Sequence, residues 1–247
     1  MASDEHRVEQ AAPHGKRTVH CADALAWLEG QGVLAGCSLI TSMPDVSEFP
    51  SLTLAEWKDW FVRTAALVLS RCPDDGVTIF YQTDIKKDGT WVDKGYLVQK
   101  AAEQQGHTLL WHKVVCRAPP GNITFGRPAY SHLLCFSRGI RADLSKSTAD
   151  VLPQAGEVTW TRGMGVRACL VACRYVLENT PTRTIVDPFC GHGTVLAVAN
   201  ELGLEAVGVE LSRKRAKKAR ALEMPRGDEA PPGEHADPES DAEDEEP

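Results

Sequence analysis

The chain contains no long hydrophobic run. Its 247 residues are 43% hydrophobic, but the apolar residues come in short stretches. None approaches the roughly 20 residues that cross a bilayer as a helix, and no apolar core typical of a secretory leader is visible. We therefore expect a soluble protein without a membrane segment. The expected location is cytoplasmic, with the nucleus as the alternative.

Paired cysteines are also missing. The sequence has eight cysteines, but no two are spaced as Cys-x-x-Cys, and most lie inside apolar runs. This pattern is typical of buried free thiols in a reducing compartment. Cys169 and Cys173 lie four residues apart, a spacing that a shared metal would allow. Because no second ligand pair accompanies them, we expect no metal site.

Apolar residues are nearly absent from the C-terminal end. Residues 226–247 contain ten acidic residues and one arginine, a net charge of −9, whereas the whole chain carries −7. Such a segment buries too little surface to offset its ordering entropy. We expect a mobile N-terminus at residues 1–15, one ordered domain at 16–224 and a disordered acidic tail at 225–247. The tail is interpreted as a solubilising extension, with competition for a basic surface or binding to a partner as the alternatives.

A glycine-rich segment near the C-terminus lacks two common phosphate-binding signatures. The apolar run Thr-Ile-Val leads into Asp-Pro-Phe-Cys-Gly-His-Gly-Thr at residues 187–194, and a second apolar run ends at Glu210. No lysine follows Gly193, as a P-loop would require. Leu196 stands where a dinucleotide fingerprint needs a small residue. What remains is a βαβ unit that ends in a carboxylate suited to ribose hydroxyls.

This segment resembles motifs I and II of class I S-adenosylmethionine-dependent methyltransferases. The alternative is a glycine-containing turn in an ordinary α/β protein. The resemblance implies that S-adenosyl-L-methionine is the cofactor, that the glycine-rich turn lies against its methionine part and that Glu210 holds its ribose. The residues that it assigns to the cofactor are Asp187, Pro188, Phe189, Cys190, Gly191, Gly193, Thr194 and Glu210.

Short apolar runs alternate with helical patterns along most of the chain. Strands are predicted at residues 17–21, 38–41, 77–81, 109–115, 132–137, 184–186 and 206–210. Helices are predicted at 24–30, 54–71, 92–105, 167–178, 194–202 and 212–224. The strands near 109–137 are joined without a helix and are expected to be antiparallel. The predicted fold is α/β: a seven-stranded, mostly parallel, Rossmann-like methyltransferase sheet with one antiparallel hairpin strand.

The order of the motifs is permuted. Leu-Ile-Thr-Ser-Met-Pro-Asp at residues 39–45 resembles the catalytic motif IV of permuted (beta-type) amino-methyltransferases and precedes the cofactor loop. In the same layout Asp23 matches the acid that approaches the adenine, and Thr41 joins the cofactor set. Residues 161–174 resemble motif X, as a helix before motif I. The resemblance covers roughly residues 17–221.

The motif IV segment supplies the candidate catalytic residues, Ser42, Pro44 and Asp45. In the family pattern this segment hydrogen-bonds an exocyclic amine, and a closing aromatic stacks on the base. Here Met43 replaces the first proline and Asp45 replaces the aromatic. Asp45 is either a proton acceptor or a helix N-cap, and the residues leave both open.

The substrate site needs another aromatic if a base is to be stacked. Phe49, Tyr81 and Phe125 are the candidates. Phe125 lies in a loop rich in glycine and proline that also carries Arg117 and Arg127, and we expect this loop to contact substrate. Six cations at residues 213–220 are interpreted either as a phosphate contact or nuclear-import signal, or as a solvated helix face.

The predicted function is S-adenosylmethionine-dependent N-methylation of nucleic acid. RNA is preferred over DNA because the chain lacks the large target-recognition insertion expected of a sequence-specific DNA enzyme. One alternative is methylation of a small molecule or a protein side chain. Another is a catalytically silent methyltransferase-like subunit that serves a partner.

Overall fold

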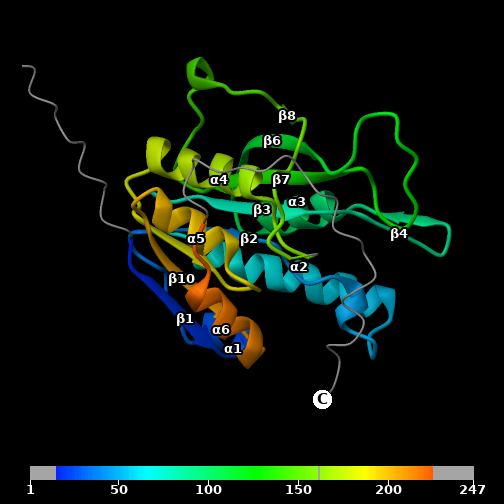
Figure 1. Ribbon diagram of the computed structural model, residues 1–247, viewed down its shortest axis with the longest axis horizontal. Coiled ribbons are helices and arrows are strands. Elements are labelled where there is room, and N and C mark those ends of the chain that lie inside the picture. The colour runs from blue at the N-terminus through cyan, green and yellow to red at the C-terminus, as the bar shows by residue number, and fades with distance from the viewer. Residues whose placement is uncertain (1–14, 161, 225–247) are drawn as a thin grey trace, which may run out of the picture.

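The computed structural model describes residues 15–160 and 162–224 (Figure 1). The predicted mobile N-terminus, apart from residue 15, and the predicted acidic tail at 225–247 lie outside these residues. The described helices and strands follow one another in a single α/β domain. Its strands are β1 (Arg17–Cys21), β2 (Cys37–Thr41), β3 (Thr78–Gln82), β4 (Ile85–Lys87), β5 (Thr90–Val92), β6 (Thr108–Cys116), β7 (Tyr130–Ser137), β8 (Val151–Leu152), β9 (Thr184–Asp187) and β10 (Glu205–Glu210).

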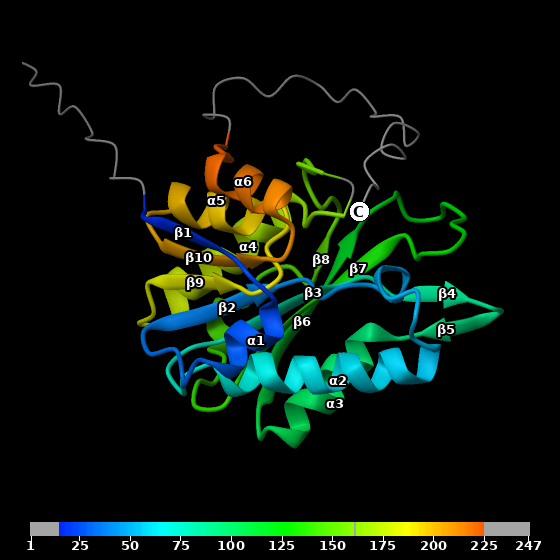
Figure 2. The same ribbon diagram turned by 90° about the horizontal axis from the view of Figure 1, so that it is seen from below.

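The helices pack in two layers, one on each face of the main sheet (Figure 2). They are α1 (Ala24–Glu29), α2 (Leu54–Ser70), α3 (Lys94–Gln104), α4 (Val166–Asn179), α5 (Thr194–Glu201) and α6 (Arg213–Ala221), with short 3-10 helices η1 (Val46–Glu48) and η2 (Leu144–Lys146). Helices α1 to α3 cover one face and α4 to α6 the other. Burial of both faces explains why the strands are apolar almost throughout.

The main sheet has eight strands in the order β1-β10-β9-β2-β3-β7-β6-β8. Strand β7 runs antiparallel to both of its neighbours, whereas every other pairing in this sheet is parallel. The cofactor-type unit β9-α5-β10 therefore lies beside β2, although more than 140 residues separate them in the chain. The carboxyl ends of these strands meet at one edge of the sheet.

The predicted class and the antiparallel hairpin strand are confirmed, but the count of seven strands was one short. Strand β8 has two residues and pairs only with β6, so no sequence periodicity marks it. The start of the third predicted helix was also wrong. Residues 85–92 form the separate β4–β5 hairpin, and α3 begins at Lys94.

The motif X segment differs from its prediction as well. Helix α4 begins at Val166, and the part of residues 155–165 that the structure describes is irregular. All eight cysteines are free, but Cys21 is exposed, and Cys37 and Cys116 are only partly buried. Among the described residues, no helix combines the length and the apolar character needed to cross a bilayer.

Candidate functional site

A cavity of about 370 Å³ opens at the edge of the sheet where β9, β10 and β2 end. Eleven of the residues predicted to form the site line it: Asp23, Ser42, Pro44, Phe49, Asp187, Pro188, Phe189, Cys190, Gly191, Thr194 and Glu210. They come from segments near both ends of the chain, which the parallel sheet brings together. The predicted cofactor loop and the predicted catalytic segment therefore share one cavity.

The turn after β9 is shaped by two glycines with left-handed backbone. Gly191 has φ of 53° and Gly193 has φ of 84°, conformations that side chains disfavour. A Cβ atom on Gly193 would also lie 2.9 Å from the Cα of Ala219, so this glycine lets α5 pack against α6. Gly191 lines the cavity, whereas Gly193 lies behind its wall.

Asp187 ends β9 as a buried carboxylate. The hydroxyl of Thr41 donates to its Oδ1 over 2.7 Å, and the backbone N–H of Phe189 donates to the same oxygen over 3.1 Å. Burial raises the pKa of Asp187 to about 7, although both hydrogen bonds oppose that rise. Thr41 does not line the cavity, so its observed role is to orient Asp187.

Two further carboxylates stand at the rim of the cavity, at the ends of β10 and β1. The Oε1 atom of Glu210 accepts from the backbone N–H of Ser212 over 2.7 Å and from the Nε of Arg215 over 2.9 Å. Asp23 caps α1 and accepts from the backbone N–H of Ala26. These contacts fix the orientation of both carboxyl groups in the lining of the cavity.

The residues of the motif IV segment do not all reach the cavity. Ser42, Met43 and Pro44 line the cavity, but Asp45 does not. The Oδ2 atom of Asp45 lies 3.4 Å from the Nζ of Lys94 and 3.2 Å from a terminal nitrogen of Arg127. Its Oδ1 caps η1 by accepting from the N–H of Ser47. Asp45 is thus a helix N-cap in the structure, as one of its two interpretations predicted. It also forms ion pairs with Lys94 and Arg127.

The predicted substrate residues are spread over three surroundings. Phe49 lines the cavity, where its ring lies 4.4 Å from that of Trp60. Tyr81 is buried inside the sheet, and burial raises the pKa of its hydroxyl. Arg117, Phe125 and Arg127 lie in the β6–β7 loop, outside the wall of the cavity.

One wall of the cavity is formed by Trp160, Arg162, Gly163 and Met164, none of which was named as a site residue, although the predicted motif X segment begins at residue 161. The indole of Trp160 stacks on the ring of His192 with 4.6 Å between centroids. Arg162 reaches across to Glu48, with 3.6 Å between the charged atoms. A Cβ on Gly191 would lie 2.7 Å from the Trp160 ring, so that glycine admits the indole. The segment is irregular, and no periodicity marked it.

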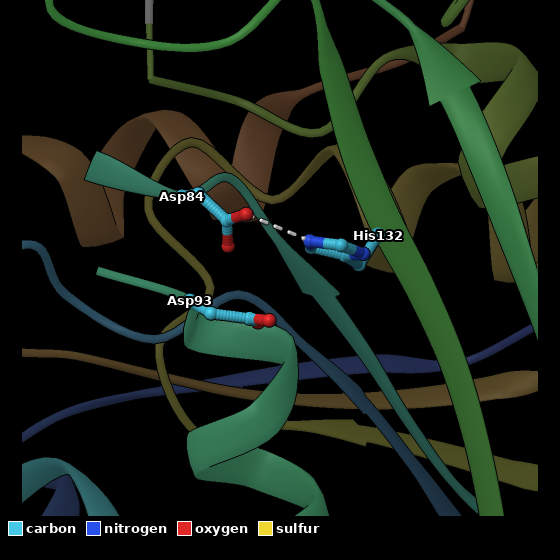
Figure 3. Close-up of side chains that lie close together, drawn as sticks. All are labelled: Asp84, Asp93 and His132. Atoms are coloured by element: carbon cyan, nitrogen blue, oxygen red, sulfur yellow. Dashed lines mark hydrogen bonds and ion pairs between the residues drawn. The ribbon is translucent and has the colours of Figure 1, made fainter. Parts of the chain in front are cut away.

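A second polar cluster lies beyond the cavity, around Asp84 (Figure 3). Ligand-type atoms of Asp84, Asp93 and His132 all lie within 4.8 Å of one another. The carboxylate of Asp84 already accepts from His132, from the Trp91 indole and from the backbone N–H of Lys94, at 3.0, 2.9 and 2.8 Å. These three donors occupy most of the roughly four acceptor sites of the carboxylate, so we interpret the cluster as a hydrogen-bonded hub.

The comparisons with known proteins give a partial family match and a fold. A family model described as "DNA methylase" matches residues 176–221, the part of the chain from the end of α4 to α6. The chain has no significant match among curated proteins. Among solved structures, the PvuII DNA methyltransferase, described as cytosine-N4-specific, is 16% identical with a TM-score of 0.64. The alignment covers 85% of this chain and 87% of that one.

Two further solved structures are similar to this chain in fold. TTHA0409 of Thermus thermophilus, solved with S-adenosyl-L-methionine, is 18% identical over 83% of this chain and 92% of that one, with a TM-score of 0.62. M1.HpyAVI, also solved with that cofactor, is 12% identical over 83% of this chain and 97% of that one, with a TM-score of 0.54. The chain has the class I methyltransferase fold in its permuted order. This is the predicted fold, and the family match over the C-terminal part of the chain agrees with the expected S-adenosylmethionine-dependent methyltransferase class.

Proposed function

We propose that this methyltransferase transfers the methyl group of S-adenosyl-L-methionine to an exocyclic amino group of a base in nucleic acid. The observation that carries the proposal is the single cavity. It joins the Gly191 turn and the Glu210 carboxylate to the Ser42 to Pro44 segment. One cavity thus offers a place for a nucleoside cofactor next to a segment that can orient an amine.

The residues present fit this cofactor. Gly191 contributes only backbone to the cavity lining, and two carboxyl groups, Asp23 and Glu210, also line it. A volume of about 370 Å³ falls within the range of small-molecule sites. When bound, S-adenosylmethionine supplies a methyl group activated by its sulfonium.

The chain's own contribution is alignment, which carries much of the catalysis in an in-line displacement. Ser42 and the main-chain carbonyls of residues 42 and 43 accept hydrogen bonds from the acceptor amine. Phe49 is the aromatic side chain of the predicted set that lines the cavity, so we assign base stacking to it. Both oxygens of Asp45 already have partners, which favours an anchoring role over proton acceptance, so the proton that the methylated amine releases passes to water.

Whether the substrate is RNA or DNA is the more specific part of the proposal. The preference for RNA depended on the absence of a large recognition insertion. Proteins described as DNA methylases are equally compact, however, because the alignments span 87% of PvuII methyltransferase and 92% of TTHA0409. Their descriptions and that of the matching family favour DNA, so RNA and DNA are the two arms of the test.

The experiment measures transfer of labelled methyl groups to purified RNA, to DNA and to a pool of free nucleosides and amines. We expect methylated amino nucleosides in one polymer, identified by mass spectrometry after digestion. Ser42→Ala should lower turnover about 10- to 1000-fold while cofactor affinity stays within about two-fold, because it contacts the acceptor. Label in the small-molecule pool alone would establish the metabolite alternative. Cofactor binding without transfer to any pool would establish the silent subunit.

A further inference from the structure

The β4–β5 hairpin and the β6–β7 loop form one projection at the end of the sheet that carries the cavity. In both views they extend beyond β3 and β7 on the same side of the molecule (Figures 1 and 2). The backbone N–H of Lys86 donates to the carbonyl of Gly126 over 2.7 Å, and its Nζ donates to the carbonyl of Thr124 over 2.9 Å. We call residues 85–92 and 117–129 together the platform.

The platform exposes large apolar side chains that a folded domain normally buries. Phe125 is 88% exposed, Ile123 85% and Trp91 50%. Lys87 is also exposed, and the Nζ of Lys86 lies 5.1 Å from the centroid of the Trp91 ring. Aromatic faces interleaved with cations are the combination that binds single-stranded nucleic acid, through base stacking and phosphate contacts.

The platform is held rigidly at both of its roots. The Asp84 hub accepts from the Trp91 indole, from His132 on β7 and from the first residue of α3, so it fixes the hairpin to the sheet. The loop is fixed by Arg127, whose ion pair with Asp45 lies one residue from Pro44 in the cavity wall. Stacking surfaces on rigid supports lose little conformational entropy when they bind.

We propose that the platform binds the single-stranded part of the substrate nucleic acid that adjoins the target base. The inference rests on the proposed function and extends it by naming where the polymer lies outside the cavity. Phe125 and Trp91 stack on bases, while Lys86 and Lys87 contact phosphates. The Arg127–Asp45 ion pair holds the platform at a fixed position relative to the cavity.

The test measures binding of fluorescent single-stranded RNA and DNA oligonucleotides to the full chain by anisotropy over a range of salt concentrations. Phe125→Ala should weaken binding about five-fold or more without changing the salt slope, because stacking is not ionic. Lys87→Ala should lower the slope of log affinity against log salt by about one. Both side chains are exposed, so neither change should disturb folding. Leu144→Ala, an equally exposed apolar side chain on η2, is the matched control and should have no effect.

Three outcomes would overturn the proposal that the platform binds nucleic acid. One is oligonucleotide binding and methyl transfer that Phe125→Ala and Lys87→Ala leave unchanged, in which case the proposed function survives without it. Another is a change of oligomeric state in Phe125→Ala, seen by sedimentation, which would make the surface an interface between copies. The last is an absence of both oligonucleotide binding and methyl transfer to nucleic acid, which would remove the proposed function as well.

Discussion

At the scale of single residues, Asp187 is buried and has a pKa of about 7, well above its ordinary 3.8. The folded chain therefore holds this proton more tightly than the unfolded chain. The stabilisation is complete below pH 4 and is lost as the pH rises through about 7, by at most about 1.4 kcal/mol per pH unit.

Asp187→Asn removes this titration. Without cofactor, we expect the unfolding free energy of the wild type to fall relative to that of the variant between about pH 4 and pH 7, and the difference to be constant above that. Urea unfolding across this pH range measures it. Parallel curves would show that Asp187 ionises normally despite its burial.

Asp45 matters at the same scale because of its partner. Lys94 is 3% exposed, burial lowers the pKa of its ammonium, and Asp45 opposes that shift. Asp45→Ala leaves this cation without its carboxylate, and we expect a loss of about 3 kcal/mol in urea unfolding. Adding Lys94→Met to that variant should restore part of the loss. An Asp45→Ala chain with wild-type stability and no turnover would instead establish catalysis by the carboxylate.

At the scale of elements, the Asp84 hub should control the β4–β5 hairpin. Burial pushes the pKa of Asp84 upward, but the donors around it outweigh that effect and the pKa lies below its ordinary value. Asp84→Ala removes the shared acceptor of Trp91, His132 and Lys94. We expect faster amide hydrogen exchange at residues 85–96 and no change in β1 or β10. Faster exchange in every element would mean that the hub supports the whole fold.

The elements also show what the sequence could predict. The strands of the parallel part were found to within about a residue, because each is an apolar run closed by a turn signal. The β4–β5 hairpin was missed although Asp88 and Gly89 have φ of 51° and 71°, as an Asp-Gly turn requires. Its strands are only three residues long, so the adjoining helical pattern dominated.

Part of the candidate site could likewise be predicted from the sequence, and part could not. Its glycine turn and carboxylates were predictable because they follow strand ends. The wall at Trp160 was not, because an irregular segment is placed by tertiary packing alone. The contact of Arg127 with Asp45 joins residues 82 positions apart, and no local pattern encodes it.

At the scale of the whole molecule, cofactor binding should stabilise the domain by mass action. At 100 times its Kd, S-adenosylmethionine contributes about 2.7 kcal/mol, which raises the Tm by roughly 5 to 10 °C for a domain of this size. Gly191→Arg should abolish the shift, because its backbone is left-handed and Trp160 fills the space. Gly32→Arg is the matched control, since open space surrounds that glycine. A shift that survives in Gly191→Arg would remove the cofactor from this cavity.

The stacking of Trp160 on His192 has an optical consequence. The indole forms part of the cavity wall and lies against an imidazole, so whatever enters the cavity changes the surroundings of this fluorophore. The protein therefore carries its own reporter of occupancy. Because the chain has six tryptophans, the emission that is lost in Trp160→Phe isolates the signal that follows the arrival and departure of a ligand, without a label.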